Sequence, residues 1–182
     1  KMIKARRAVP PNLETPDDAG AAARALIGQE AYELNVQQFC CAGLNFGYFY
    51  SGSPIMTDDG ETPPAYTMGA FTPSTVPGCR APHFWLPDGR SLYDAFGPGY
   101  TLLRFDATAD VSALLLAAQA RRLPLTLLDI DPQGVPEAYR HALVLCRADQ
   151  HVVWRGKQVP ADPAALVDVL RGVGREALRL AA

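Results

Sequence analysis

The residues of this 182-residue chain that are best suited to chemistry are four cysteines and three histidines. Cys40 and Cys41 are adjacent, and adjacent cysteines rarely form a disulfide with each other. Because free cysteines are among the most buried residue types, packing at a helix end is the favoured interpretation of this pair, with a reactive thiol as the alternative. The histidines lack HxH and HExxH spacing, and the cysteines lack zinc-ribbon spacing. We therefore predict no metal site and no catalytic residue.

A thiol–disulfide enzyme of the thioredoxin type needs a Cys-x-x-Cys pair at the start of the helix that follows its first strand. The matching positions here, residues 106 to 110, read Asp-Ala-Thr-Ala-Asp and hold no thiol. The sequence also lacks a Gly-x-Gly-x-x-Gly turn, a Walker loop and a serine nucleophile elbow. We therefore expect no thiol–disulfide exchange and no bound flavin or nucleotide, and we predict that the chain alone is inactive.

One dense cluster, residues 77 to 89, combines groups that suit binding to another surface. Arg80 and His83 provide hydrogen-bond donors, and Trp85 provides an apolar anchor before a Pro-Asp-Gly turn. These three are the candidate interface residues. The alternative is that Arg80 and His83 only satisfy carbonyl groups of the neighbouring loop.

The composition, with 48% hydrophobic and 20% charged residues, is that of a globular protein. A net charge of -2 at pH 7 provides no field that would attract phosphates or anionic lipids, so nucleic acid and membranes are not expected as partners. No apolar run is long enough to span a membrane, and no signal-peptide pattern is present. The few cysteines fit a reducing compartment, so we expect a cytoplasmic protein.

The first 50 residues are predicted to form a lead-in helix followed by a strand. Thr15 is a favourable N-cap with Pro16 at the first helical position, and apolar residues such as Leu26 recur at a spacing of three to four. The strand is expected at residues 46 to 50, which read Phe-Gly-Tyr-Phe-Tyr.

Residues 51 to 98 are rich in Gly, Pro and aromatic side chains and show no periodicity in their first thirty positions. A connection of this length is rare within a compact domain, so we predict a docking segment that lies on another surface. The aromatic residues expected to need cover there are Tyr66, Phe71, Phe84 and Trp85.

Residues 99 to 182 are predicted to form a thioredoxin-like α/β core with the order β-α-β then β-β-α. The expected elements are strands at 100 to 105, 125 to 130, 142 to 146 and 151 to 154, a helix from about 111 to 122, and a last helix after Asp162 and Pro163. The last helix should turn Leu166, Leu170, Val173 and Ala177 inward.

Two blocks of this sequence, in this order, resemble the C-terminal domain of FAD-dependent aromatic hydroxylases. The second block, residues 147 to 156, reads Arg-Ala-Asp-Gln-His-Val-Val-Trp-Arg-Gly and is similar to the hairpin near the C-terminus of that family. Residues 29 to 48 resemble the family's helix and strand that lead into the domain. The first block comprises Pro77-Gly78, Arg80-Ala81-Pro82-His83, Trp85-Leu86, Asp88-Gly89, Ser91-Leu92-Tyr93-Asp94, Phe96-Gly97 and Tyr100-Thr101-Leu102-Leu103.

The resemblance implies a parent monooxygenase, a flavoprotein that uses FAD, NAD(P)H and O₂ to hydroxylate a phenolic or polyketide ring. It implies that this chain packs on the FAD and substrate domains of the parent, with a second subunit as a further candidate partner. The family's dinucleotide fingerprint and flavin-ribose motif belong to preceding domains and are missing here, so no catalytic or cofactor-binding residue is transferred. The alternative is a stand-alone, redox-inactive thioredoxin-like module that binds a protein through residues 51 to 98.

Overall fold

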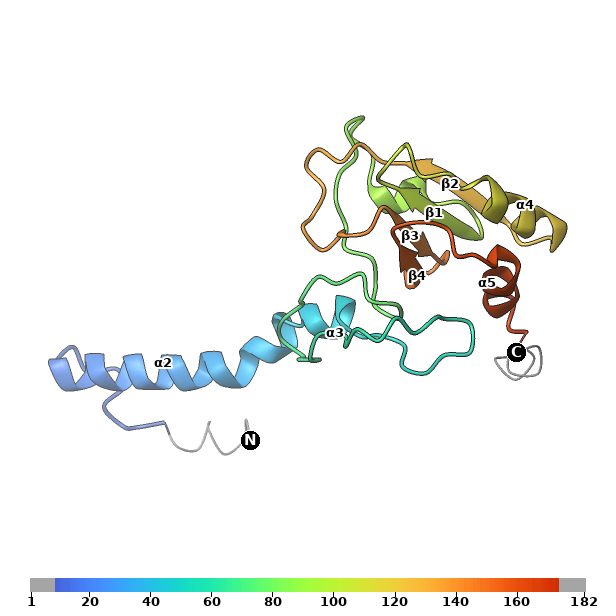
Figure 1. Cartoon of the computed structure of the whole chain (residues 1–182). Helices are drawn as coiled ribbons and strands as arrows, with labels where there is room; N and C mark the ends of the chain where they lie inside the picture. Colours follow the sequence, from blue (N-terminus) through green and yellow to red (C-terminus); the bar gives the residue numbers. More distant parts are fainter. Residues whose placement is uncertain (1–8, 174–182) are drawn as a thin grey trace. The chain divides into compact units, whose positions relative to one another are not determined.

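The chain forms two compact units, and the computed structural model describes residues 9 to 173 (Figure 1). Unit 1 comprises Lys1–Phe46 and Tyr66–Phe71, and unit 2 comprises Gly47–Ala65 and Thr72–Ala182. Among the helices that are described, none combines the length and the apolar character needed to cross a membrane.

The long helix of unit 1, α2 (Asp18–Phe39), begins later than the sequence predicted. Its N-cap is Asp17, whose carboxylate accepts a hydrogen bond from the Gly20 amide at 2.7 Å. The hydroxyl of Thr15 lies 2.9 Å from the same carboxylate, so Thr15 supports the cap and Pro16 precedes the helix. The prediction of Thr15 as N-cap was wrong because an aspartate two residues later caps a helix equally well.

The apolar residues that recur along α2 at a spacing of three to four are not buried in the structure as described. Of the helix residues whose burial is described, only Gly20 is buried, whereas Leu26, Tyr32 and Phe39 are exposed. The three-to-four spacing is present in the sequence, but burial does not follow it.

The strand predicted at residues 46 to 50 does not form. A short helix, α3 (Ala42–Phe46), includes the first of these residues, and Phe49 forms only an isolated antiparallel bridge. Gly43 lets this helix approach the main chain of Thr67, because a Cβ atom at Gly43 would lie 1.7 Å from the Thr67 carbonyl oxygen. Local strand propensity could not predict a helix that depends on such a distant contact.

Unit 2 is built on a four-stranded mixed sheet with the order β2-β1-β3-β4 (Figure 1). β1 and β2 are parallel, whereas β1 and β3 and then β3 and β4 are antiparallel. The order β-α-β then β-β-α, after a helix and a long irregular segment, confirms the predicted fold class. The elements are β1 (Tyr100–Arg104), α4 (Ser112–Ala120), β2 (Leu125–Asp129), β3 (Leu143–Cys146), β4 (Val152–Gly156) and α5 (Pro163–Leu170).

The last helix, α5, starts as predicted but ends sooner. The carboxylate of Asp162 accepts a hydrogen bond from the first turn, and Pro163 is the first helical residue. Gly172 has a φ of +77°, a conformation that commonly ends helices. Val173 is 41% exposed, so its predicted inward position is wrong, and Ala177 lies outside the described residues.

Both faces of the sheet are buried, because successive strand residues point to opposite sides. One face packs against α4 and α5 through a cluster that includes Leu102. The other face carries Leu103 and Val144 and is covered by residues 81 to 96, which include the short 3-10 helix η1 (Leu92–Ala95). Part of the predicted docking segment therefore belongs to the core of unit 2.

Irregular segments cover the outer edge of β4. The amide of Thr57 donates to the Val153 carbonyl at 2.9 Å, and the amide of Gly78 donates to the Val152 carbonyl at 2.8 Å. Pairing of this kind protects an edge strand from other chains.

Arg155 of β4 holds one of these segments through its guanidinium group, which is only 4% exposed. It donates to the Asp59 carboxylate at 2.7 Å, to the Thr75 hydroxyl at 3.1 Å and to the Glu61 carboxylate. A buried charge is tolerated only when it is paired and hydrogen-bonded, and this network meets that requirement.

We predict that Arg155→Ala lowers the free energy of unfolding by about 2 to 4 kcal/mol, because it leaves a buried hydroxyl and two carboxylates without their donor. Urea unfolding of the purified chain measures the change. Arg171→Ala, in an exposed ion pair with Asp168, is the matched control and should change stability by no more than about 0.5 kcal/mol. Equal losses in the two variants would contradict the anchoring role of Arg155.

Candidate docking surface

Trp85 lies on a tight hairpin that holds its side chain out into solvent. The amide of Leu86 donates to the Arg90 carbonyl at 2.9 Å, and Trp85 forms an antiparallel bridge with Ser91. Gly89 has a φ of +82°, which a side chain would disfavour, so the turn depends on this glycine. The Trp85 side chain is 70% exposed on a rigid support, which suits a binding anchor.

His83 supports the Trp85 ring from one side. Its Nε2 atom lies 2.9 Å from the Ser91 hydroxyl oxygen, and its ring centroid lies 5.0 Å from that of Trp85 in an edge-to-face arrangement. The Tyr93 ring contacts His83 from another side, at 5.1 Å between centroids. The indole is therefore oriented before any partner binds.

Arg80 is fixed by side chains on two sides. Its Nε atom donates to the Gln150 side-chain carbonyl at 2.9 Å, and its guanidinium carbon lies 5.1 Å from the centre of the Tyr93 ring. The structure thus connects Arg80 and His83 through Tyr93, a residue that the site prediction did not name, while Trp85 contacts His83. Arg80 and His83 thus contact the side chains of Gln150 and Ser91, and their role in docking stays a prediction.

The aromatic residues predicted to need cover have different surroundings. Phe84, next to the exposed Trp85, is only 8% exposed and packs in the core of unit 2, so its cover comes from its own unit. Tyr66 is exposed, and Phe71 is half-buried and contacts Phe46 edge-to-face within unit 1, at 6.1 Å between centroids.

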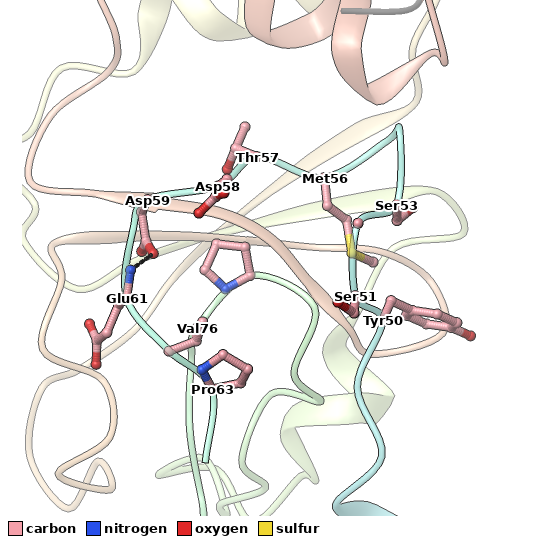
Figure 2. Close-up of a pocket in the computed structure, with 12 residues that line it drawn as sticks. Tyr50, Ser51, Ser53, Met56, Thr57, Asp58, Asp59, Glu61, Pro63 and Val76 are labelled. Carbon is pink, nitrogen blue, oxygen red and sulfur yellow. Dashed lines mark hydrogen bonds between the residues drawn. The ribbon is translucent and has the colours of Figure 1, made fainter. Parts of the chain in front are cut away.

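Two shallow cavities lie in the irregular part of unit 2. The first, of about 200 Å³, is drawn in Figure 2 and is lined by the acidic loop from Asp58 to Glu61 and by Tyr50 and Met56. The Asp59 carboxylate there accepts hydrogen bonds from the Glu61 amide, shown as a dashed line, and from Arg155. In the part of the chain that the structure describes, no group of three or more His, Cys, Asp or Glu side chains could hold a metal ion.

The second cavity, of about 240 Å³, lies beside Arg155 and Arg140. Hydroxyl side chains, among them Thr75, line it together with Glu61. Arg155 is already paired with the Glu61 and Asp59 carboxylates, so its positive charge is neutralised by residues of the same unit.

The turn between β1 and α4 is the place in this fold where the pyrophosphate of a flavin dinucleotide could meet a helix N-terminus. A dinucleotide needs a glycine-rich turn and a helix N-terminus free of negative charge. Asp106 and Asp110 occupy this turn, and hydrogen bonds from Thr108 and from the Ser112 amide keep the pKa of these carboxyl groups below their usual range. Two ionised carboxylates repel a pyrophosphate, so this turn does not fit the pyrophosphate of FAD.

The cysteines divide into an exposed and a buried group. Cys40 is exposed and Cys41 is half-buried, so the interpretation of the pair as buried packing is wrong for Cys40. Cys79 and Cys146 are buried, and their burial raises the pKa of both thiols, which makes them poor nucleophiles.

His151 and Arg155 are two of the four buried polar residues in the described part of the chain, none of which the site prediction named. Both fall in the hairpin block of the family resemblance, but a single histidine or arginine in a strand does not reveal its partners. Arg155 bonds Asp59, 96 positions earlier, and His151 contacts the rings of Tyr48 and Tyr50. Only the folded chain shows these contacts.

Comparison with known families decides what kind of domain this is. The family model described as "Aromatic-ring hydroxylase, C-terminal" matches residues 74–175, more than half of the chain. The chain belongs to this family. The matched residues form the sheet of unit 2, the cover of its second face and α5.

Relatives of this aromatic-ring hydroxylase C-terminal domain are much longer proteins. Phenol 2-monooxygenase of Pseudomonas sp. (strain EST1001) is 34% identical over 173 residues, covering 84% of this chain and 27% of the relative. The rebeccamycin biosynthetic enzyme RebC with reduced flavin has a TM-score of 0.75 and 36% identity, over 93% of this chain and 31% of RebC.

A ternary complex of aklavinone-11 hydroxylase with FAD and aklavinone has a TM-score of 0.58 and 28% identity, over 74% of this chain and 27% of that protein. The chain thus spans about a third or less of the length of these relatives.

We predict that Trp85→Ala and Phe84→Ala have very different effects on stability, although the residues are adjacent. Loss of the exposed indole should lower the free energy of unfolding by less than about 1 kcal/mol, whereas loss of the buried phenyl ring should lower it by about 3 to 5 kcal/mol. Chemical denaturation of each variant measures this. A large loss for Trp85→Ala would show that the indole is a structural residue and not a free anchor.

Proposed function

We propose that this domain is the C-terminal part of a FAD-dependent monooxygenase that hydroxylates an aromatic substrate with NAD(P)H and O₂. The observation that carries the proposal is the family match over residues 74–175. The names of the relatives support an aromatic substrate, because they include a phenol monooxygenase and a hydroxylase crystallised with FAD and aklavinone. When bound, FAD would supply the activation of oxygen, and other domains of the parent would hold it.

The role we propose for this domain is structural, as a thioredoxin-like domain that docks on the FAD and substrate domains of the parent. Arg80, His83 and Trp85 form the contact, with Trp85 as the apolar anchor and Arg80 and His83 as the polar residues that fix its geometry. A second copy of the protein is a further proposed partner. Nothing in the described structure favours the stand-alone binding module.

We also propose a cytoplasmic location for the parent. All four cysteines are free, which fits a reducing compartment.

We predict that the purified 182-residue chain is colourless, whereas the full-length product of its gene carries flavin. The acidic turn before α4 gives the chain no pyrophosphate site. Absorbance between 350 and 500 nm, roughly the flavin range, after desalting checks both proteins. Stoichiometric flavin on the short chain would contradict the assignment of the cofactor to other domains. Absence of flavin and of substrate-dependent NAD(P)H oxidation in the full-length protein would contradict the proposed parent.

We predict that Arg80→Ala, His83→Ala and Trp85→Ala weaken docking in the full-length protein, each by about 1 to 3 kcal/mol. Limited proteolysis should release the domain faster in each variant, and hydroxylation should slow in parallel. Arg90→Ala is the matched control, because Arg90 lies on the same hairpin but pairs with Asp88 in solvent. If the three variants keep wild-type assembly and activity and lose only thermal stability, the docking proposal is wrong.

A further inference from the structure

The chain enters unit 2 through residues 47 to 51, called the 47–51 strip here, and the strip is held to the sheet by few main-chain contacts. The Tyr50 amide donates to the Gly78 carbonyl at 3.0 Å, and Phe49 forms a bridge with Cys79. The segment that contains Gly78 is itself paired with the first residues of β4. The strip is thus two rows beyond the last regular strand, and its attachment depends on its side chains.

Those side chains rest on one buried residue, His151. The ring centroids of Tyr48 and Tyr50 lie 5.1 Å and 4.7 Å from that of His151, and the guanidinium carbon of Arg147 lies 5.7 Å from the centre of the Tyr50 ring. The two tyrosines are partly exposed, whereas His151 is 0% exposed. The tyrosine rings therefore form part of the cover of the imidazole.

The hydrogen bonds of His151 fix where its proton is. Nδ1 lies 3.0 Å from the carbonyl oxygen of Asp149, and because a carbonyl can only accept, Nδ1 carries the hydrogen. Nε2 is then the free lone pair, and it is buried without a donor among the described residues. A second proton could bind only at Nε2, where the resulting N–H would have no acceptor.

The charges around His151 also oppose a second proton. Burial is the main reason that the pKa of His151 is lowered, and the cations of Arg80 and Arg147 lower it further. The Asp149 carboxylate, 3.6 Å from Nδ1, acts in the opposite direction but is shared with Arg147 at 3.1 Å. The tyrosine rings attract a cation through their faces, but among the described residues Nε2 has no hydrogen-bond partner.

We propose that His151 is a proton-operated lock, in which proton uptake at Nε2 releases the 47–51 strip while the four-stranded sheet stays folded. Water reaches Nε2 when the tyrosine rings move away, so the open form binds the proton more tightly than the closed form. By linkage, a fall in pH below about 6.5, the ordinary pKa of histidine, shifts the population toward the open form.

The core does not depend on the strip, which is why opening can stay local. The two apolar clusters on the faces of the sheet contain no residue of the 47–51 strip. Local opening of a segment with few buried contacts costs less free energy than global unfolding. The chain passes from unit 1 to unit 2 at this strip, so its release would add free residues to that connection, each able to span at most about 3.3 to 3.6 Å.

Hydrogen–deuterium exchange of the 182-residue chain between about pH 8 and pH 5, corrected for intrinsic exchange, tests the lock. Protection of the Tyr50 amide should fall by up to about tenfold for each pH unit below about 6.5, while β1 and β3 keep their protection. His151→Phe, which fills the space and removes the proton site, should abolish this pH dependence. His141→Gln is the matched control, because His141 is also a partly buried histidine whose pKa is lowered by burial, and it should keep the dependence.

Protection of the strip that does not change with pH in the wild-type chain, or that changes equally in His151→Phe, would overturn the proposal. A second measurement needs no variant. NMR titration of the wild-type imidazole resonances gives the midpoint of His151 protonation, which must coincide with the midpoint of strip opening. Different midpoints would also overturn the lock.

Discussion

A short sheet that must be buried on both faces is the constraint on which the rest of unit 2 depends. Leu102 and Leu103 point to opposite sides of β1, and each requires an apolar cover. Helices α4 and α5 cover one side. The other side is covered by residues 81 to 96, which are held in place by contacts such as the hydrogen bond from the Tyr139 hydroxyl to the Pro82 carbonyl at 2.7 Å. An irregular segment thus covers one face of the sheet, as helices cover the opposite face.

The edge strand β4 holds the remaining irregular chain through two buried polar residues with different chemistry. Arg155 binds the loop around Asp59 and Glu61 through charge-assisted hydrogen bonds. His151 supports Tyr48 and Tyr50 through ring contacts, and its neutral form is the one that the fold accommodates. One edge therefore carries one attachment made by ion-paired hydrogen bonds and one made by contacts between aromatic rings.

The same constraint explains why Trp85 is free to act as an anchor. Phe84 is directed into the core, and because successive residues of an extended strand point to opposite sides, Trp85 points outward. His83, which itself contacts Tyr93, then fixes the orientation of the indole. The β1–α4 turn is acidic and does not suit a flavin pyrophosphate, so the exposed indole on its fixed support is the feature on which we base the proposed docking role.

The sequence by itself determined the periodic half of the chain, including the β-α-β and β-β-α order and the Asp162 cap with Pro163. It also indicated Arg80, His83 and Trp85 as candidate interface residues, because their residue types and the turn that follows them can be read from a short stretch of sequence. Only the tertiary structure decided that residues 42 to 46 are helical and that Arg155 is paired with Asp59, 96 positions away. Periodicity and capping depend on neighbours a few residues apart, whereas irregular segments take their conformation from long-range contacts that no local pattern encodes.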